Sequence, residues 1–461
     1  MKGPRDTGRG TGPTGDLREV ANQPLAEDLH ASAVLEARLG RPARDVLEAT
    51  VVLEAWTGAP AAEAMSAAQR LVQRDGPPQR ALGAIDPFED AEHTSVFAEG
   101  LTLVLLIVSI AAWAAPIRAH LGPRVLEHAI RVALPLAVAF QWGLRSRYLG
   151  RPQGLACLAR DGIRFWVAIL IVICTPLLFV PSWGPTAAML IPIWVGSMIL
   201  TRRGWGLVYA GVLVVGTIAL DNSGHPQTLL AAITAVTLLM CLAAIRTSRS
   251  RRTDARPGSI ERALAAALIG GMTGALLIGD PTVGLGVHGL HPAVALLPSV
   301  IGSYWGGFYL WNFFEAVPRG LRGVSLERAG SLALSDPPMS IFLGAILRLL
   351  IAVVVLSGLV IALGGFLGGT DALTVFIAFG CAGTFSMLVG MLEAFALQTA
   401  ALVAASAALI TELEWTAHVH SSSPGTALAV GAAVGIVLSL PGLLVRLAHS
   451  GGTLATTMWI Q

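Results

Sequence analysis

The sequence of 461 residues is poor in charge and almost devoid of lysine. Only 13% of its residues are charged, about half the fraction of an ordinary soluble domain, whereas 54% are hydrophobic and the mean hydropathy is +0.68. This composition excludes a soluble globular protein and predicts an integral membrane protein. Lys2 is the only lysine, and the other basic residues are arginine, a bias that indicates a GC-rich bacterial genome.

Cysteine and the motifs of soluble catalysis are also scarce. Cys157, Cys174, Cys241 and Cys381 lie far apart, and no pair has the spacing of a disulfide framework or a metal site. The chain has no phosphate-binding G-x-x-x-x-G-K-[ST], no H-E-x-x-H and no G-x-S-x-G. We therefore expect no enzymatic activity, no cofactor, no metal and no nucleic-acid partner. Any energy must come from an ion gradient, the substrate gradient or a partner.

The first 95 residues differ from the rest of the chain because they are polar, and we expect no signal peptide there. Residues 1–24 are rich in glycine, proline and charge, which predicts a disordered N-terminus. Residues 25–95 are expected to form a cytoplasmic helical region and a linker, with three short helices within 25–75. Such a unit is small for an independent core, so we expect it to pack on the membrane domain or on a partner.

From residue 96 onward, the chain consists almost entirely of apolar segments long enough to cross a bilayer. They predict an all-α fold, a polytopic membrane helix bundle of about twelve transmembrane helices. The tenth and eleventh segments share one apolar run with a turn near Glu393 and Gln398, so a re-entrant pair is an alternative. The expected spans are 96–116, 125–144, 164–182, 185–201, 203–220, 227–246, 261–279, 292–316, 340–363, 372–391, 395–412 and 425–447.

The arginines fall mostly in alternate loops between these segments. Because basic residues are retained on the cytoplasmic side, the pattern predicts that both termini are cytoplasmic and that the bacterial inner (plasma) membrane is the location. Arg118 and Arg124, in the first outer loop, are the exception. The basic cytoplasmic linker 247–260 separates a first six-helix half, 96–246, from a second half, 261–461, as in many transporters.

The eighth expected span holds the densest aromatic cluster of the sequence. Tyr304, Phe308, Trp311 and Glu315 follow helical spacing and share one face, and the polar Asn312 lies beside them. A ring-lined face above a carboxylate is typical of a binding site for a bulky polar ligand, so we expect these residues to bind substrate. The alternative is an interfacial aromatic belt combined with helix packing.

Ionisable side chains at membrane depth are further candidates because their burial is costly. Arg131 lies in the second span with Glu127 one turn earlier, so it either binds substrate or forms an ion pair on the helix surface. Gln141 lies deeper on the same helix and joins the expected substrate site. Arg348 lies in the ninth span and either extends to the cytoplasm or meets Glu315 or a ligand phosphate.

Histidines in the expected outer loops form a second polar group. His288 and His291 follow Asp280, at the end of the seventh span. Because their spacing does not match a structural metal site, we expect a polar outer rim there.

The 6+6 arrangement, the lack of an ATPase motif and the segment ALLPSVIGSYWGGFYLWNFFEAVPRGLRG together resemble the multidrug/oligosaccharidyl-lipid/polysaccharide flippase superfamily, over residues 96–449. The resemblance implies a transporter that flips or exports a lipid-linked saccharide or another precursor of a cell-envelope polysaccharide. Its expected partners are membrane lipid or the lipid-linked saccharide itself.

Two other functions stay open. The first is an ion-coupled small-molecule transporter of the major facilitator type, although GLRSRYLGR lacks the Asp of that family's loop motif. The second is a scaffold subunit that holds an envelope-synthesis protein through residues 25–75. A flippase needs cationic groups such as Arg131 and Arg348 for a pyrophosphate, whereas a proton-coupled carrier needs a buried carboxylate.

Overall fold

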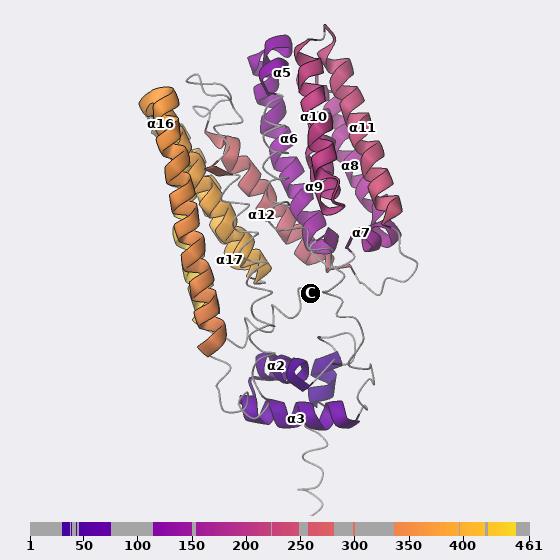
Figure 1. Ribbon diagram of the computed structural model, residues 1–461, viewed down its shortest axis with the longest axis vertical. Coiled ribbons are helices and arrows are strands. Elements are labelled where there is room, and N and C mark those ends of the chain that lie inside the picture. Colours follow the sequence, from indigo (N-terminus) through magenta and orange to yellow (C-terminus); the bar gives the residue numbers. More distant parts are fainter. Residues whose placement is uncertain are drawn as a thin grey trace, which may run out of the picture.

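The computed structural model describes short helices that precede the membrane region and a large set of apolar helices (Figure 1). No β-strand occurs within the described ranges. These ranges are 30–36, 38, 43, 46–74, 114–149, 154–222, 224–248, 257–280, 298–299, 336–395, 397–419 and 423–448.

The helices before the basic linker pack into a first bundle (Figure 1). Pro123 and Pro226 stand in the first turns of two of them, where the missing N–H costs nothing. Gly204 has a φ of 82° and makes the tight turn between two others. The helices and helical turns are α5 (Ala114–Leu121), α6 (Pro123–Leu144), η1 (Arg145–Leu149), α7 (Gly154–Cys157), η2 (Leu158–Gly162), α8 (Ile163–Leu178), α9 (Gly184–Arg202), α10 (Gly206–Asp221) and α11 (Pro226–Thr247).

The helices after the linker form a second bundle, which comprises α12 (Ile260–Gly279), α16 (Asp336–Ala394), α17 (Gln398–His418) and α18 (Thr426–Ala448). Ser259 caps the start of α12, where its hydroxyl accepts a hydrogen bond from the backbone N–H of Arg262 at 3.3 Å. The chain leaves α16 at Ala394 and enters α17 at Gln398, so the structure has two separate helices at the turn near Glu393.

Two boundaries in the second bundle differ from those expected. Residues 364–372, expected as an outer loop, are helical because α16 runs through them. In lipid, a helical backbone keeps its N–H and C=O groups paired, so glycine-rich apolar sequence remains helical more readily than in water. Helix α17 ends at His418 and not near residue 412, which places Glu412 inside the helix.

Seven helical segments are long and apolar enough to cross a membrane, among the residues that the structure describes. Outward-facing side chains of α8, such as Ile171, Val172 and Leu178, are apolar and exposed, as expected for contact with lipid. The protein is therefore an all-α, multi-pass membrane protein, as the composition predicts. The segments are Gly154–Leu178, Gly184–Arg202, Pro226–Thr247, Ile260–Gly279, Ala372–Ala394, Gln398–His418 and Thr426–Val445.

The remaining expected spans correspond to shorter or more polar helices, or lie outside the described residues. The span expected at 125–144 is α6, whose first turns carry charged residues, and that at 203–220 is α10, with 16 residues. The span at 340–363 is part of α16. Those at 96–116 and 292–316 lie mostly or wholly outside the described ranges.

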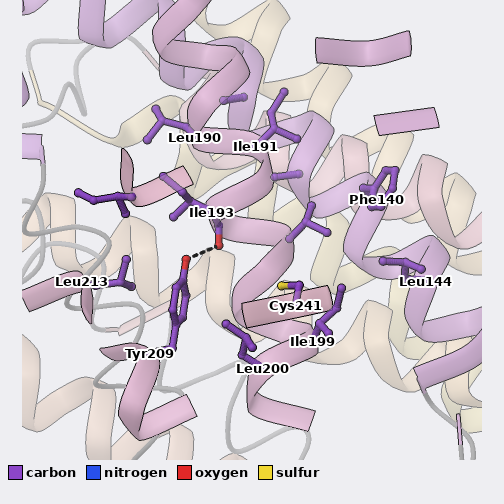
Figure 2. Packing of buried hydrophobic residues seen from close by; sticks show 14 of the residues in the cluster. Phe140, Leu144, Leu190, Ile191, Ile193, Ile199, Leu200, Tyr209, Leu213 and Cys241 are labelled. Atoms are coloured by element: carbon purple, nitrogen blue, oxygen red, sulfur yellow. Dashed lines mark hydrogen bonds between the residues drawn. The ribbon is translucent and has the colours of Figure 1, made fainter. Parts of the chain in front are cut away.

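Each bundle has its own buried apolar cluster. The cluster of the first bundle draws its buried members from residues 117–245 and includes large side chains such as Phe140, Leu144 and Tyr209 (Figure 2). The cluster of the second bundle draws its buried members from residues 269–443, apart from Val51 of the N-terminal region. The two clusters thus lie on either side of the basic linker in the sequence.

The two bundles meet where α12 packs along α6. Glycines of α12 allow this close approach: a Cβ on Gly274 would lie 2.9 Å from the Cα of Pro135, and one on Gly270 would lie 2.7 Å from Cγ of Trp142. Small residues at such a contact let two helix backbones approach closely in lipid. Because α12 also packs against α17, this helix bridges the two bundles.

The N-terminal region contains α2 (Val46–Thr57) and α3 (Ala61–Arg74), which pack on each other. Gly58 has a φ of 69° and ends α2. The guanidinium of Arg38 lies 3.6 Å from the ring centre of Trp56, a cation–π contact. Val51 is buried in the cluster of the second bundle, so α2 packs against the membrane region.

Candidate functional site

The structure describes only part of the expected substrate site. Tyr304, Phe308, Trp311, Asn312 and Glu315 lie outside the described residues. The aromatic face of the eighth expected span therefore stays a prediction.

Arg131, Gln141 and Arg348 lie in helices. Arg131 forms a 2.7 Å ion pair with Glu127, and their side chains are 41% and 45% exposed, as expected for an i, i+4 pair on the outer surface of α6. Gln141 donates a hydrogen bond from Nε2 to the backbone oxygen of Trp194 at 2.6 Å and so links α6 to α9. The backbone of Arg348 lies in α16, and its side chain is outside the description.

A different polar site emerges in the second bundle around Glu412. This residue lies in α17, and its exposed fraction is 0%. Neither carboxylate oxygen has a hydrogen-bond partner of normal geometry among the described residues, although the backbone N–H of Asp280 lies close to them. An ionised carboxylate in such a position would be destabilised by several kcal/mol, so its charge requires a function or a neutralising partner.

The second acid of the site is Asp280, at the C-terminal end of α12. It is only 5% exposed, and its Oδ2 accepts a hydrogen bond from the backbone N–H of Leu428 at 3.4 Å. Leu428 lies in the first turn of α18, where backbone N–H groups lack helical partners and favour a negative charge. Asp280 therefore has a stabilising environment as a carboxylate, unlike Glu412.

Two glycines give Glu412 the space that it occupies. A Cβ on Gly279 would lie 2.5 Å from Oε2 of Glu412, and a Cβ on Gly431 of α18 would lie 2.9 Å from the Cβ of Glu412. Three helices thus converge on one carboxyl group. A larger side chain at Gly279 would compete with the carboxyl for volume, and one at Gly431 would collide with the helix that carries Glu412.

Sequence reasoning missed this acid pair because it placed both residues at the ends of spans. Asp280 was assigned to a polar outer rim, and Glu412 to the last position of its segment. The spacing of the sequence could have predicted that Glu412 is buried. It lies on the same helix face as three alanines, at positions i, i+4, i+7 and i+11, and all four residues are buried: Ala401, Ala405, Ala408 and Glu412. An acid that ends a stripe of alanines lies on a face that packs closely against other helices.

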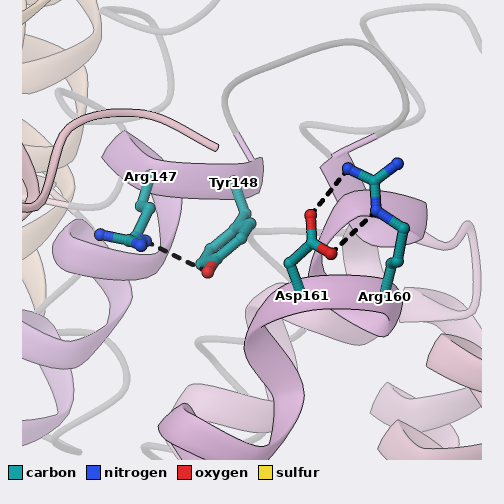
Figure 3. Close-up of polar contacts among 4 residues, drawn as sticks. All are labelled: Arg147, Tyr148, Arg160 and Asp161. Carbon is teal, nitrogen blue, oxygen red and sulfur yellow. Dashed lines mark hydrogen bonds and ion pairs between the residues drawn. The ribbon is translucent and has the colours of Figure 1, made fainter. Parts of the chain in front are cut away.

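Another polar cluster lies at the opposite end of α12, in the π-helical turns η1 and η2. The side chain of Arg147 donates from Nε to the hydroxyl of Tyr148 at 3.1 Å, and Arg160 pairs with Asp161 at 2.7 Å (Figure 3). The backbone N–H of Gly258, just before α12, donates to the carbonyl of Arg147 at 2.8 Å. The 20 residues of α12 rise about 30 Å, the thickness of a hydrocarbon core. The basic cluster and the acid pair therefore mark the two ends of one membrane-length helix.

The first bundle also has a pocket of about 80 Å³ that is partly open to the surface of the bundle. Its lining is apolar and includes Phe140, Trp166, Pro192, Cys241 and Leu242. The pocket offers no polar group to hold a sugar or an ion, so among the described features the acid pair is the stronger candidate site.

Comparison with known proteins adds no assignment, since no protein-family description, curated protein or solved structure matches this chain.

Proposed function

We propose that this protein is a membrane transporter in which two helix bundles move against each other along the α6–α12 contact. The observation that carries the proposal is the division of the core into two buried clusters, one before and one after the basic linker, joined through glycines of α12. Separate cores that meet mainly along one pair of helices, with small residues at the closest points, suit bundles that rock as rigid bodies. A single continuous core would favour a static scaffold.

The proposed cargo is a lipid-linked saccharide of the bacterial cell envelope, and the proposed location is the inner membrane with both termini cytoplasmic. The full proposed plan has about twelve spans in two six-helix halves. The basic cluster at the start of α12 and the acid pair at its end support this orientation, because basic residues favour the cytoplasmic side. The flippase resemblance of the sequence supplies the cargo class.

A second candidate is an ion-coupled carrier of a small molecule, and the buried carboxyl of Glu412 favours it. The two candidates differ in cargo but share the two moving bundles. A test of movement therefore applies to both, and the choice of cargo then separates them.

A reversible disulfide across the α6–α12 contact tests the proposal. A Cβ on Gly271 would lie 3.4 Å from the Cβ of Ala139, close to the separation found in disulfides. We expect Ala139→Cys with Gly271→Cys, in a background without the four native cysteines, to stop translocation of a lipid-linked oligosaccharide in proteoliposomes when oxidised. Reduction should restore it.

A matched control places the disulfide inside the second bundle. A Cβ on Gly442 of α18 would lie 3.4 Å from the Cβ of Ala400 of α17. Ala400→Cys with Gly442→Cys should remain active when oxidised because no bundle moves against another there. If oxidation of the α6–α12 pair leaves translocation intact, the rocking proposal is wrong. If the reduced protein moves a small solute but no lipid-linked saccharide, the second candidate replaces the first.

A further inference from the structure

We infer that Glu412 and Asp280 form a proton-binding site that controls the packing of α12 against α17 and α18. Its role as the coupling site rests on the proposed transport function, whereas proton binding itself does not. The site is defined by one fully buried carboxyl group, that of Glu412, which lacks a hydrogen-bond partner of normal geometry among the described residues. It interacts electrostatically with Asp280 where three helices meet.

The geometry favours a proton over a permanently ionised pair. Two carboxylates that face each other in a low-dielectric site repel, and the repulsion is relieved when one of them takes up a proton. Asp280 accepts a backbone hydrogen bond at the start of α18 and suits the charged form. Glu412 has no comparable donor of normal geometry among the described residues, so it is the member that holds the proton.

No other described ionisable group competes for this role. On α17 itself, Glu414 pairs with His418 at 3.1 Å, and the two side chains are 67% and 74% exposed. The first turns of α18 carry no ionisable residue. Glu393 lies at the end of α16 that adjoins the start of α17, far from Glu412 along that helix.

The neighbouring glycines connect the proton to helix movement. Gly279 lets the end of α12 lie directly against the Glu412 carboxyl. With the proton bound, the neutral carboxyl fits this contact. With the proton lost, repulsion between Glu412 and Asp280 acts between α17 and α12, and α12 is also the helix that joins the two bundles. Protonation thereby changes the relative stability of the packed and separated arrangements.

Infrared spectroscopy of the purified full-length protein, in a detergent that contains no ester carbonyl, tests the inference without any substrate. A protonated carboxylic acid has a carbonyl stretching band that a carboxylate lacks. We expect such a band at neutral pH, its loss in Glu412→Gln, and its retention in Glu414→Gln, the matched exposed control two residues away. In Asp280→Asn, the band should disappear at a lower pH than in the parent protein because the repelling charge is gone.

Three results would overturn the inference. A spectrum without any acid band at neutral pH would mean that Glu412 is ionised. A band that survives in Glu412→Gln, with its pH dependence unchanged in Asp280→Asn, would come from another group. A band that disappears when sodium is added at constant pH would assign the site to a metal cation. None of these outcomes depends on the disulfide experiment, so failure of the proton site and failure of the transport proposal are distinguishable.

Discussion

The two bundles handle buried polar groups differently. In the first bundle, the hydroxyl of Tyr209, a fully buried residue, donates to the carbonyl of Ile193 at 3.1 Å and lies 2.9 Å from Oγ1 of Thr237 (Figure 2). In the second bundle, Glu412 packs against Gly279 and Gly431 and has no hydrogen-bond partner of normal geometry among the described residues. The hydrogen bonds of Tyr209 link α10 to α9 and α11. Glu412 makes no such link and remains as a buried acid where helices of the second bundle meet.

The chemical nature of the unpartnered atoms reinforces this difference. The buried atoms without a partner in the described part of the first bundle belong to neutral groups, namely Ser146, Trp166, Thr186 and Trp194. Leaving a neutral group unpaired costs about 1–3 kcal/mol, which a stable fold tolerates. An ionisable group costs more and can change its charge, so the second bundle is where a change of protonation alters packing.

Among the substitutions proposed for this comparison, the largest effect on stability is expected at Gly435, a tightly packed glycine of the second bundle. A Cβ on Gly435 of α18 would overlap the ring of Phe385 and lie 3.0 Å from the Cβ of Ala408. Because Phe385 is fully buried, the ring has no free space to enter. We expect Gly435→Ala to destabilise the protein by roughly 1–3 kcal/mol, measured as a lower midpoint of thermal unfolding in detergent.

Gly211 in the first bundle provides the control, because nothing lies within 4 Å of the Cβ that it would carry. Gly211→Ala should leave the unfolding midpoint unchanged or raise it, since alanine favours the helix by up to about 1 kcal/mol. If both substitutions have the same effect, the close contact of Gly435 with Phe385 does not determine stability there.

A smaller effect is expected from the paired polar groups of the first bundle. Tyr209→Phe removes a hydroxyl and leaves the Ile193 carbonyl and the Thr237 hydroxyl with one partner fewer, so we expect a loss of about 1–2 kcal/mol in unfolding free energy. The same measurement on Glu412→Gln should show a smaller loss, because a neutral amide replaces a neutral acid of nearly the same size and no hydrogen bond of normal geometry among the described residues is removed. A larger loss of unfolding free energy in Glu412→Gln than in Tyr209→Phe would mean that Glu412, and not Tyr209, is the more stabilising buried polar group.

Adding Thr237→Val to Tyr209→Phe sharpens this result. If the two hydroxyls stabilise each other, the double substitution should cost less than the sum of the single ones. Strict additivity would mean that Tyr209 acts through the Ile193 carbonyl alone.

Much of the helical architecture could be predicted from the sequence because lipid imposes strong rules. A backbone that crosses a membrane must pair its own N–H and C=O groups, so apolar length alone predicts helices such as α9, α11 and α12. Helix ends were harder, because glycine ends a helix in water but not reliably in lipid. The segment between the ninth and tenth expected spans, which contains the glycines of residues 364–369, was expected as a loop, but α16 is helical there.

The acid pair could not be predicted from single segments of the sequence, because it forms only when distant helices pack together. Asp280 and Glu412 are far apart in the sequence, and each is unremarkable at the end of an apolar run. Only the meeting of α12, α17 and α18 makes Glu412 a buried acid. In contrast, Arg131 stood out in its own segment, and the structure pairs it with Glu127 at an exposed position, as one of the two sequence interpretations proposed.

The smallest effect on stability is expected in the N-terminal helices, from the protonation of Glu54 in α2. Partial burial in α2 raises the pKa of Glu54 above its ordinary value of 4.5. The folded state therefore holds this proton more tightly than the unfolded state does. The resulting stability is fully present below pH 4.5 and is lost as the pH rises through the folded-state pKa. Above that pKa the Glu54 contribution is constant.

Hydrogen exchange of the α2 amides in the full-length protein can measure this effect. After correction for the intrinsic pH dependence of exchange, the free energy of local opening should fall with rising pH in the parent protein and should fall less in Glu54→Gln. Glu63→Gln, an exposed position in the first turn of α3, is the matched control and should follow the parent protein. A parent-like pH dependence in Glu54→Gln would mean that another group governs it. In that case, the burial of Glu54 would have no measurable effect on the pH dependence of α2.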